Sequence, residues 1–143
     1  SRSVPDPILT EQVKNAFREL GLPWPPPAFK PVIYYNKELS VVEVLVADTS
    51  YTEVQLTTDH YIAVFERNHH FRYRERHFVG FNLWVVKGVC AKMGIESVGK
   101  ISMRQILKFL HEHEEDQFIR DAITEIMLPM LEDHNLDEFE IPT

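Results

Sequence analysis

Four short segments rich in β-branched and aromatic residues follow one another between residues 32 and 67. Such residues are enriched in strands. The connections between the segments, NKE, DTS and TDH, are short and polar, whereas a parallel crossover would need about a dozen residues or more. The chain is therefore predicted to form an antiparallel β-meander. The segments are VIYYN (32–36), LSVVEVLVA (39–47), YTEVQLT (51–57) and YIAVFER (61–67).

A fifth strand is predicted from at least His77 to Leu83, because side chains of two kinds alternate along this stretch. Residues 68–76 are either the beginning of this strand or a long loop. If the alternation continues through them, one row of side chains faces outward. This row is Arg72, Arg74, Arg76, Phe78, Gly80, Asn82 and Trp84.

Amphipathic helical patterns precede and follow the strands. The first runs from Asp6 to a stop at Gly21, and the later ones cover residues 84–93, a segment beginning at Ser102, and residues 115–131 with an interruption near Pro129. Strands in one block and helices in another predict an α+β fold. We expect about five antiparallel strands with helices packed on one face, an N-terminal helix first and the C-terminal helices last.

The length and composition predict one domain over residues 1–143. A chain of 143 residues with 44% hydrophobic residues can bury a core without disulfides or metal. Residues 1–6 are expected to be a disordered end or an expression remnant. Residues 23–31 hold five prolines and are expected to form a stiff connector. Residues 132–143 are expected to be a loose acidic tail.

Neither a membrane span nor a secretion signal is visible in the sequence. No apolar run reaches the roughly 18–20 residues needed to cross a bilayer, and the first residues lack the apolar stretch of a signal peptide. The single cysteine, Cys90, lies in an apolar segment and cannot form an internal disulfide. We therefore expect a cytoplasmic protein without membrane contact.

The net charge of −7 is unevenly distributed. Residues 111–143 contain eleven acidic residues and one arginine, a balance of −10, so residues 1–110 carry +3. Such asymmetry is typical of a protein that binds a partner of complementary charge. It is equally typical of an acidic end that folds back on a basic middle.

The segment ERNHHFRYRERHF (66–78) contains the densest cluster of positive charge. Arginines two residues apart on a strand, with rings beside them, could contact an acidic protein or the phosphates of a nucleic acid. The same pattern is typical of the solvated face of a hairpin. No known nucleic-acid-binding motif accompanies it, so nucleic acid is the less favoured partner. The candidate partner-binding residues are Arg67, Arg72, Arg74, Arg76, Tyr73 and Phe78.

Aromatic residues make up 11% of the chain and suggest a second kind of site. A curved sheet covered by helices can enclose a pocket lined by such residues. Simple core packing explains the same residues equally well. The pocket candidates are Tyr34, Tyr35, Phe65, Phe81 and Trp84.

No motif for catalysis, phosphate binding or metal binding occurs. The chain has no GxSxG elbow, no GxxxxGK[ST] loop and no HExxH or CxxC spacing. An enzyme is not favoured, although carboxylate pairs assembled by the fold leave no signature in spacing. We expect no metal and no cofactor. The histidine-rich groups considered are His69, His70 and His77 with Glu66 and Glu75, and His111 with His113 and Glu115.

The favoured function is a small interaction module that acts through charge-complementary protein contacts, for example an immunity or inhibitor protein. The alternatives are a small-molecule binder or enzyme with an aromatic pocket between sheet and helices, and a nucleic-acid binder that uses the basic hairpin. An outward patch of Phe78, Trp84 and Trp24 favours a homodimer. Residues 34–83 resemble small bacterial β-meander domains of unknown function in their strand pattern, which implies no activity and no site residues.

Overall fold

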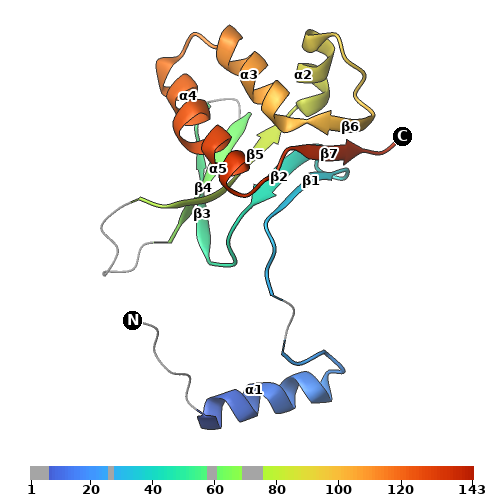
Figure 1. The fold of residues 1–143 in the computed structure, drawn as a ribbon, viewed down its shortest axis with the longest axis vertical. Helices are drawn as coiled ribbons and strands as arrows, with labels where there is room; N and C mark the ends of the chain where they lie inside the picture. The colour runs from blue at the N-terminus through green and yellow to red at the C-terminus, as the bar shows by residue number, and fades with distance from the viewer. Residues whose placement is uncertain (1–6, 26–27, 58–60, 69–75) are drawn as a thin grey trace.

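The computed structural model describes residues 7–25, 28–57, 61–68 and 76–143. In these ranges the expected strands and helices are present, with two further short strands near the C-terminus (Figure 1). The elements are α1 (Pro7–Glu19), β1 (Val32–Asn36), β2 (Val41–Leu45), β3 (Tyr51–Gln55), β4 (Ile62–Arg67), β5 (Phe78–Trp84), α2 (Val86–Met93), β6 (Gly99–Ser102), α3 (Met103–His113), α4 (Gln117–Ala122), the π-helix η1 (Ile123–Met127), α5 (Leu128–Asp133) and β7 (Glu138–Ile141).

The five strands β1 to β5 form one antiparallel sheet, and the α+β prediction is confirmed. The strand order is β1-β2-β5-β4-β3, so the sheet is not a consecutive meander, and the predicted pairing of β2 with β3 is corrected. Burial explains the order. Strand β5 is buried along almost its whole length and takes the centre, whereas β3 is mostly exposed and forms an edge.

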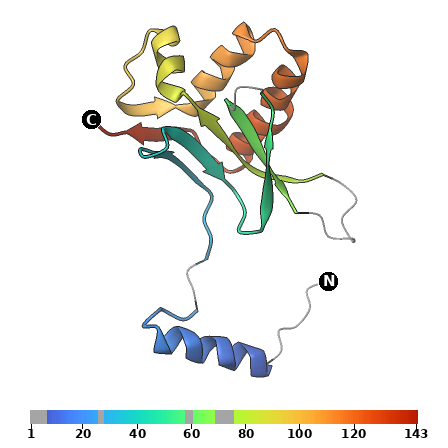
Figure 2. The same ribbon diagram turned by 180° about the vertical axis from the view of Figure 1, so that it is seen from behind.

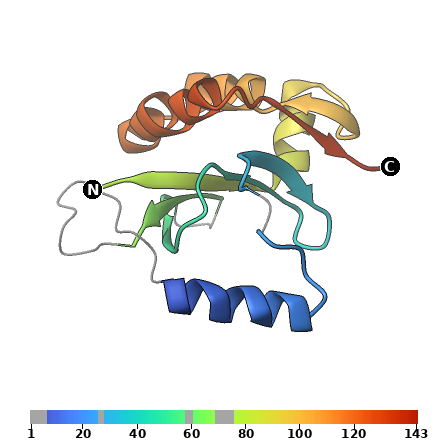
Figure 3. The same ribbon diagram turned by 60° about the horizontal axis from the view of Figure 1, so that its bottom comes forward.

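Helices α2 to α5 cover one face of this sheet, which we call the covered face (Figures 1 and 3). Strand side chains that point to this face join the helices in one apolar core. The opposite face, here called the open face, carries the alternate side chains of the same strands. The buried core residues of the covered face are Val42, Val44, Ile62, Val64, Phe81 and Leu83.

Gly80 permits close packing at the centre of the open face. A Cβ atom at this position would lie 2.2 Å from the Val44 carbonyl oxygen and 2.7 Å from Phe65 Cδ2. Gly80 pairs with Phe65 on β4 and with Leu45 on β2. The ring of Phe65 therefore covers the glycine, as aromatic side chains do at strand glycines.

The C-terminal residues are packed, which corrects the prediction of a loose tail over 132–143. Strand β7 pairs antiparallel with β6 in a second, two-stranded sheet, and Phe139 and Ile141 are buried in the core. Asp137 adds polar contacts, since its Oδ1 accepts from Ser102 Oγ at 2.7 Å and from the Arg104 backbone N–H at 3.0 Å. Alternating burial along β7 shows that this segment is an amphipathic strand.

Pro129 accounts for the irregular C-terminal helix. Proline has no N–H to donate within a helix and crowds the preceding turn. The residues before it form η1, in which the Leu128 N–H bonds to the Ile123 carbonyl, five residues back. The helix interruption that the sequence predicted near Pro129 is therefore a π-helical turn. In the described residues, no helix is long and apolar enough to cross a membrane.

Candidate functional site

The structure describes only part of the predicted basic surface. Arg72, Tyr73 and Arg74 lie outside the described residues. Arg67 is half-buried at the end of β4. Arg76 forms an ion pair with Glu66, and its Cζ lies 5.1 Å from the centroid of the Phe78 ring. Arg76 therefore contacts residues of the β4–β5 hairpin to which it belongs.

A β-bulge changes the direction of Phe78. Phe65 pairs with Gly80, but the next residue, Glu66, pairs with Phe78, so β5 holds one extra residue at this point. Phe78 consequently packs against the core and does not share the outward direction of Gly80. The predicted outward row is therefore broken at the bulge, and Phe78 contributes no outward apolar patch.

The five aromatic pocket candidates do not come together. Tyr35 packs against the core and Phe81 is part of it, on the covered face. Tyr34, Phe65 and Trp84 follow the opposite alternation and belong to the open face. Successive side chains of a strand point to opposite faces of the sheet, and this alternation separates the two groups. Tyr34 and Tyr35, for example, are neighbours in β1.

The open face carries a band of polar side chains across its strands. The Tyr34 hydroxyl donates to the Glu43 carboxylate, and Asn82 Nδ2 donates to Glu53 Oε1 at 2.7 Å. Asn82 is only 2% exposed. Its Oδ1 and the indole Nε1 of Trp84 are buried without a hydrogen-bond partner among the described residues. Buried polar atoms without a partner lower the stability of the fold.

The Tyr34 phenol is expected to ionise later than an ordinary tyrosine. Its hydrogen bond to Glu43, followed by burial and the Glu43 charge, raises the pKa of Tyr34 to about 12. The folded-state pKa thus lies above the ordinary value of 10.0, so the stabilisation is complete below pH 10 and is lost as pH rises through 12.

An absorbance titration of the five tyrosines should show one late phenolate, with circular dichroism recording that the chain stays folded. Tyr34→Phe should remove that late step, and Glu43→Gln should shift it to lower pH. Ionisation of every tyrosine in one step near pH 10 in the folded protein would contradict the hydrogen bond.

Helix α1 is set apart from the core. It lies beyond the connector, away from the sheet and on the side opposite α2 to α5 (Figures 1 and 2), and none of its residues belongs to the core. Its end is well formed, because Gly21 adopts φ 71° and the Leu22 N–H bonds to the Phe17 carbonyl at 2.8 Å, a Schellman cap. Phe17 packs edge-on against Trp24 with centroids 5.2 Å apart.

The apolar stripe of α1 is exposed to solvent. Ile8 is 71% exposed and Leu20 73%, and Val13, Leu22 and Trp24 are exposed as well. A helix with one apolar stripe normally buries that stripe. The sequence predicted this helix and its stripe, but nothing in the pattern indicated that the stripe would stay uncovered within the chain.

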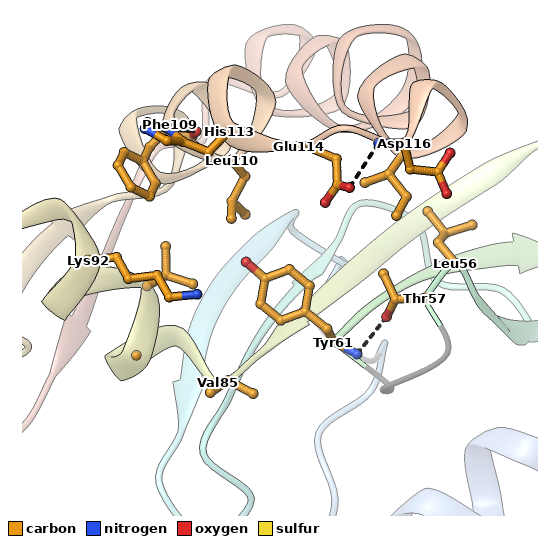
Figure 4. Close-up of a pocket in the computed structure, with 13 residues that line it drawn as sticks. Leu56, Thr57, Tyr61, Val85, Lys92, Phe109, Leu110, His113, Glu114 and Asp116 are labelled. Atoms are coloured by element: carbon orange, nitrogen blue, oxygen red, sulfur yellow. Dashed lines mark hydrogen bonds between the residues drawn. The ribbon is translucent and has the colours of Figure 1, made fainter.

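A pocket of ≈ 600 Å³ opens between the sheet and the helices, next to the end of the β3–β4 hairpin (Figure 4). Such a volume lies within the range of about 300–1,000 Å³ typical of small-ligand sites. Six of its side chains are charged or polar, namely Thr57, Tyr61, Lys92, His113, Glu114 and Asp116. The apolar lining comprises Leu56, Val85, Val89, Phe109, Leu110 and Ile119.

The α3–α4 turn fixes one wall of this pocket. Asp116 Oδ1 caps α4 by accepting from the Phe118 N–H at 2.9 Å, and Glu114 Oε1 accepts from the Asp116 N–H at 3.0 Å. His113 Nδ1 lies 2.9 Å from the Phe109 carbonyl oxygen, and its ring stacks on Phe109 at 4.2 Å. Local hydrogen bonds therefore hold the charged residues of this turn in place.

Val85 carries backbone strain at the edge of the pocket. It adopts φ 57° and ψ 32°, the left-handed conformation, immediately before α2. A β-branched residue seldom adopts this conformation, which costs about 1–3 kcal/mol and is found preferentially at functional sites. No sequence pattern indicates this strain, because valine is common in strands and helix starts alike.

Other reactive groups offer no second site among the described residues. Cys90 is fully buried, and burial raises the pKa of its thiol, which disfavours the reactive thiolate. In the described ranges, no three His, Cys, Asp or Glu side chains are placed to hold a metal ion. His69, His70 and Glu75 of the first histidine-rich group lie outside those ranges.

These features define an α+β protein in which helix α1 exposes apolar side chains and a pocket is lined by both polar and apolar residues. Comparisons of the chain with protein-family models, with curated proteins and with solved structures found no match.

Proposed function

We propose that the protein is a non-catalytic interaction module in which α1 docks on a second copy of the same chain. The exposed apolar stripe of α1 carries this proposal. Each buried apolar side chain of this size contributes about 1.5–3 kcal/mol. Docking of Val13 and Leu20, which lie on the same side of the helix, would therefore supply a driving force for association.

The open face of the sheet is the surface that α1 would cover on the second copy. It presents Val32, Tyr34 and Tyr51 as exposed apolar side chains. Val13 and Leu20 of α1 and the exposed side chains of this face are both accessible to solvent. A two-fold exchange would cover each of them in both copies, as isologous dimers do.

Apolar contact, and not charge, supports the docking of α1. Lys14 and Arg18 lie on another side of the helix from Leu20, and Glu11 and Glu19 balance their charge. The connector supports reach toward another molecule, since its described residues, 23–25 and 28–31, are exposed and rich in proline.

Light scattering coupled to size-exclusion chromatography over a dilution series tests the proposal. The unaltered chain should dimerise, and Leu20→Asp should weaken dimerisation more than tenfold, because it places a charge on the apolar stripe. Asn15→Asp adds the same charge to an exposed position outside the stripe and should leave the dimer intact. Both variants should keep the circular dichroism of the parent chain, since α1 contributes nothing to the core.

A chain that stays monomeric at every concentration would overturn the proposal. A dimer that resists Leu20→Asp would place the interface elsewhere.

A further inference from the structure

We propose that the pocket between the sheet and helices α2 to α4 binds a small zwitterion with an apolar body, the chemical class of amino acids and short peptides. The proposal is independent of docking by α1, because α1 contributes no lining residue. It rests on the arrangement of opposite charges around an apolar floor, and on the strained residue at the pocket edge.

Hydrogen-bond donors gather on one side of the pocket. Lys92 extends from α2 with its ammonium directed into the space, and the hydroxyl of Tyr61, the residue before β4, points to the same region (Figure 4). The Lys92 ammonium can donate to a carboxylate. This side is therefore suited to the acid group of a ligand.

Carboxylates stand on the other side. Glu114 directs its carboxylate into the pocket from the α3–α4 turn, and Asp116 lies beside it (Figure 4). The bond from the Asp116 N–H holds Glu114 in this orientation. An ionised carboxylate accepts several hydrogen bonds, so Glu114 retains capacity for a ligand ammonium. This side is suited to the amine of the same ligand.

The floor between the two sides is apolar and has room for a side chain. Val89, Leu110 and Ile119 line it. Gly88 adds open space, because a Cβ atom there would meet a single neighbour within 4 Å, Val85 Cγ1 at 3.2 Å. Apolar contact in the middle with a few polar groups at the ends is typical of small-ligand sites.

The backbone of Val85 is an independent indication of function at this place. Its left-handed conformation is strained for a β-branched residue, and strain of this kind clusters at ligand sites and switch regions. The strain lies at the β5–α2 junction, which positions both Gly88 and Lys92 on the pocket side of α2.

Three related probes test the proposal with the full chain: L-phenylalanine, phenethylamine and 3-phenylpropionate. The first has both charged groups, the second lacks the acid and the third lacks the amine. Titration followed by calorimetry and by chemical-shift changes should show tightest binding for L-phenylalanine or its dipeptide. Each single-group probe should bind about tenfold or more weakly, since a hydrogen bond to a charged group is lost.

Substitutions of Lys92 and Glu114 test which charged group of the ligand each side of the pocket binds. Lys92→Met should weaken L-phenylalanine and 3-phenylpropionate about tenfold and leave phenethylamine unchanged. Glu114→Gln should weaken L-phenylalanine and phenethylamine and leave 3-phenylpropionate unchanged, while the amide oxygen still accepts from the Asp116 N–H. The matched controls are Lys87→Met and Glu115→Gln, two exposed positions outside the lining, which should bind like the parent chain.

Gly88→Leu provides a test that does not depend on charge. Its side chain should occupy the apolar floor and abolish binding of all three probes, whereas the fold should persist because Gly88 is an exposed helical position. Absence of saturable binding by every probe and by the dipeptide would overturn the proposal. Equal losses for all probes in Lys92→Met and Glu114→Gln would also overturn it, because the two ends would then not be distinguished.

Discussion

Gly80→Ala is expected to lower the free energy of unfolding by about 3 kcal/mol, at the upper end of the range for overpacked interiors. The added methyl would lie 2.2 Å from the Val44 carbonyl oxygen and 2.7 Å from the Phe65 ring. The ring could rotate, but the carbonyl belongs to the backbone of the neighbouring strand. Strands β2 and β5 would therefore have to separate. Denaturant unfolding followed by circular dichroism measures the loss.

Gly88→Ala is the matched control for this prediction. It adds the same methyl group in α2, where the contact at 3.2 Å is the far end of the Val85 side chain. Alanine also favours a helix over glycine by about 1 kcal/mol. Its stability should stay within about 1 kcal/mol of the parent chain. Equal stability of the two variants would show that the close contact at Gly80 is absent in solution.

Phe139→Ala is expected to destabilise the fold by about 3–5 kcal/mol. Phe139 lies in β7, is only 4% exposed, and belongs to the same core as the helices. Truncation would leave a cavity beneath β6 and β7 that the paired strands could only partly close. Thermal and denaturant unfolding are the measurements.

Glu140→Ala serves as the control, because it alters the next residue of the same strand on its exposed side. Surface changes of this kind usually alter stability by about 0.5 kcal/mol or less. Similar small effects of both substitutions would mean that the C-terminal segment is loosely held, as its acidic composition suggests.

Local patterns predicted most of the secondary structure. VIYYN coincides with β1, and the next three segments contain β2, β3 and β4 within their limits. A helix was predicted to begin at Ser102, and the Ser102 Oγ caps α3 by accepting from the Gln105 N–H at 3.2 Å. These features depend on neighbouring residues, so the sequence suffices to predict them.

Non-local features were beyond the reach of such patterns. The order of strands depends on which strand can be buried on both faces, and the bulge at Glu66 and Phe78 depends on the pairing of β4 with β5. The acidic residues around Phe139 and Ile141 masked a strand whose two inward positions are apolar. The prediction of a loose tail relied on the acidic charge of this segment, although apolar and acidic side chains alternate along it.

The pocket illustrates the same limit for function. Its lining comes from the end of the β3–β4 hairpin, from α2, and from the α3–α4 turn, and no spacing in the sequence relates Tyr61, Lys92 and Glu114. The predicted aromatic residues were chosen by type, and the alternation of strands distributes them over two faces. Only the fold brings the actual lining together.

The central place of β5 has a consequence for the route by which the chain folds. The β1–β2 and β3–β4 hairpins each close over short loops, but they meet only through β5, which follows both in the chain. During synthesis the two hairpins emerge from the ribosome with bare edges and no common neighbour. Closure across Val41 and Trp84 is a late step of high contact order, and until it occurs each hairpin is open to pairing with strands of other nascent chains.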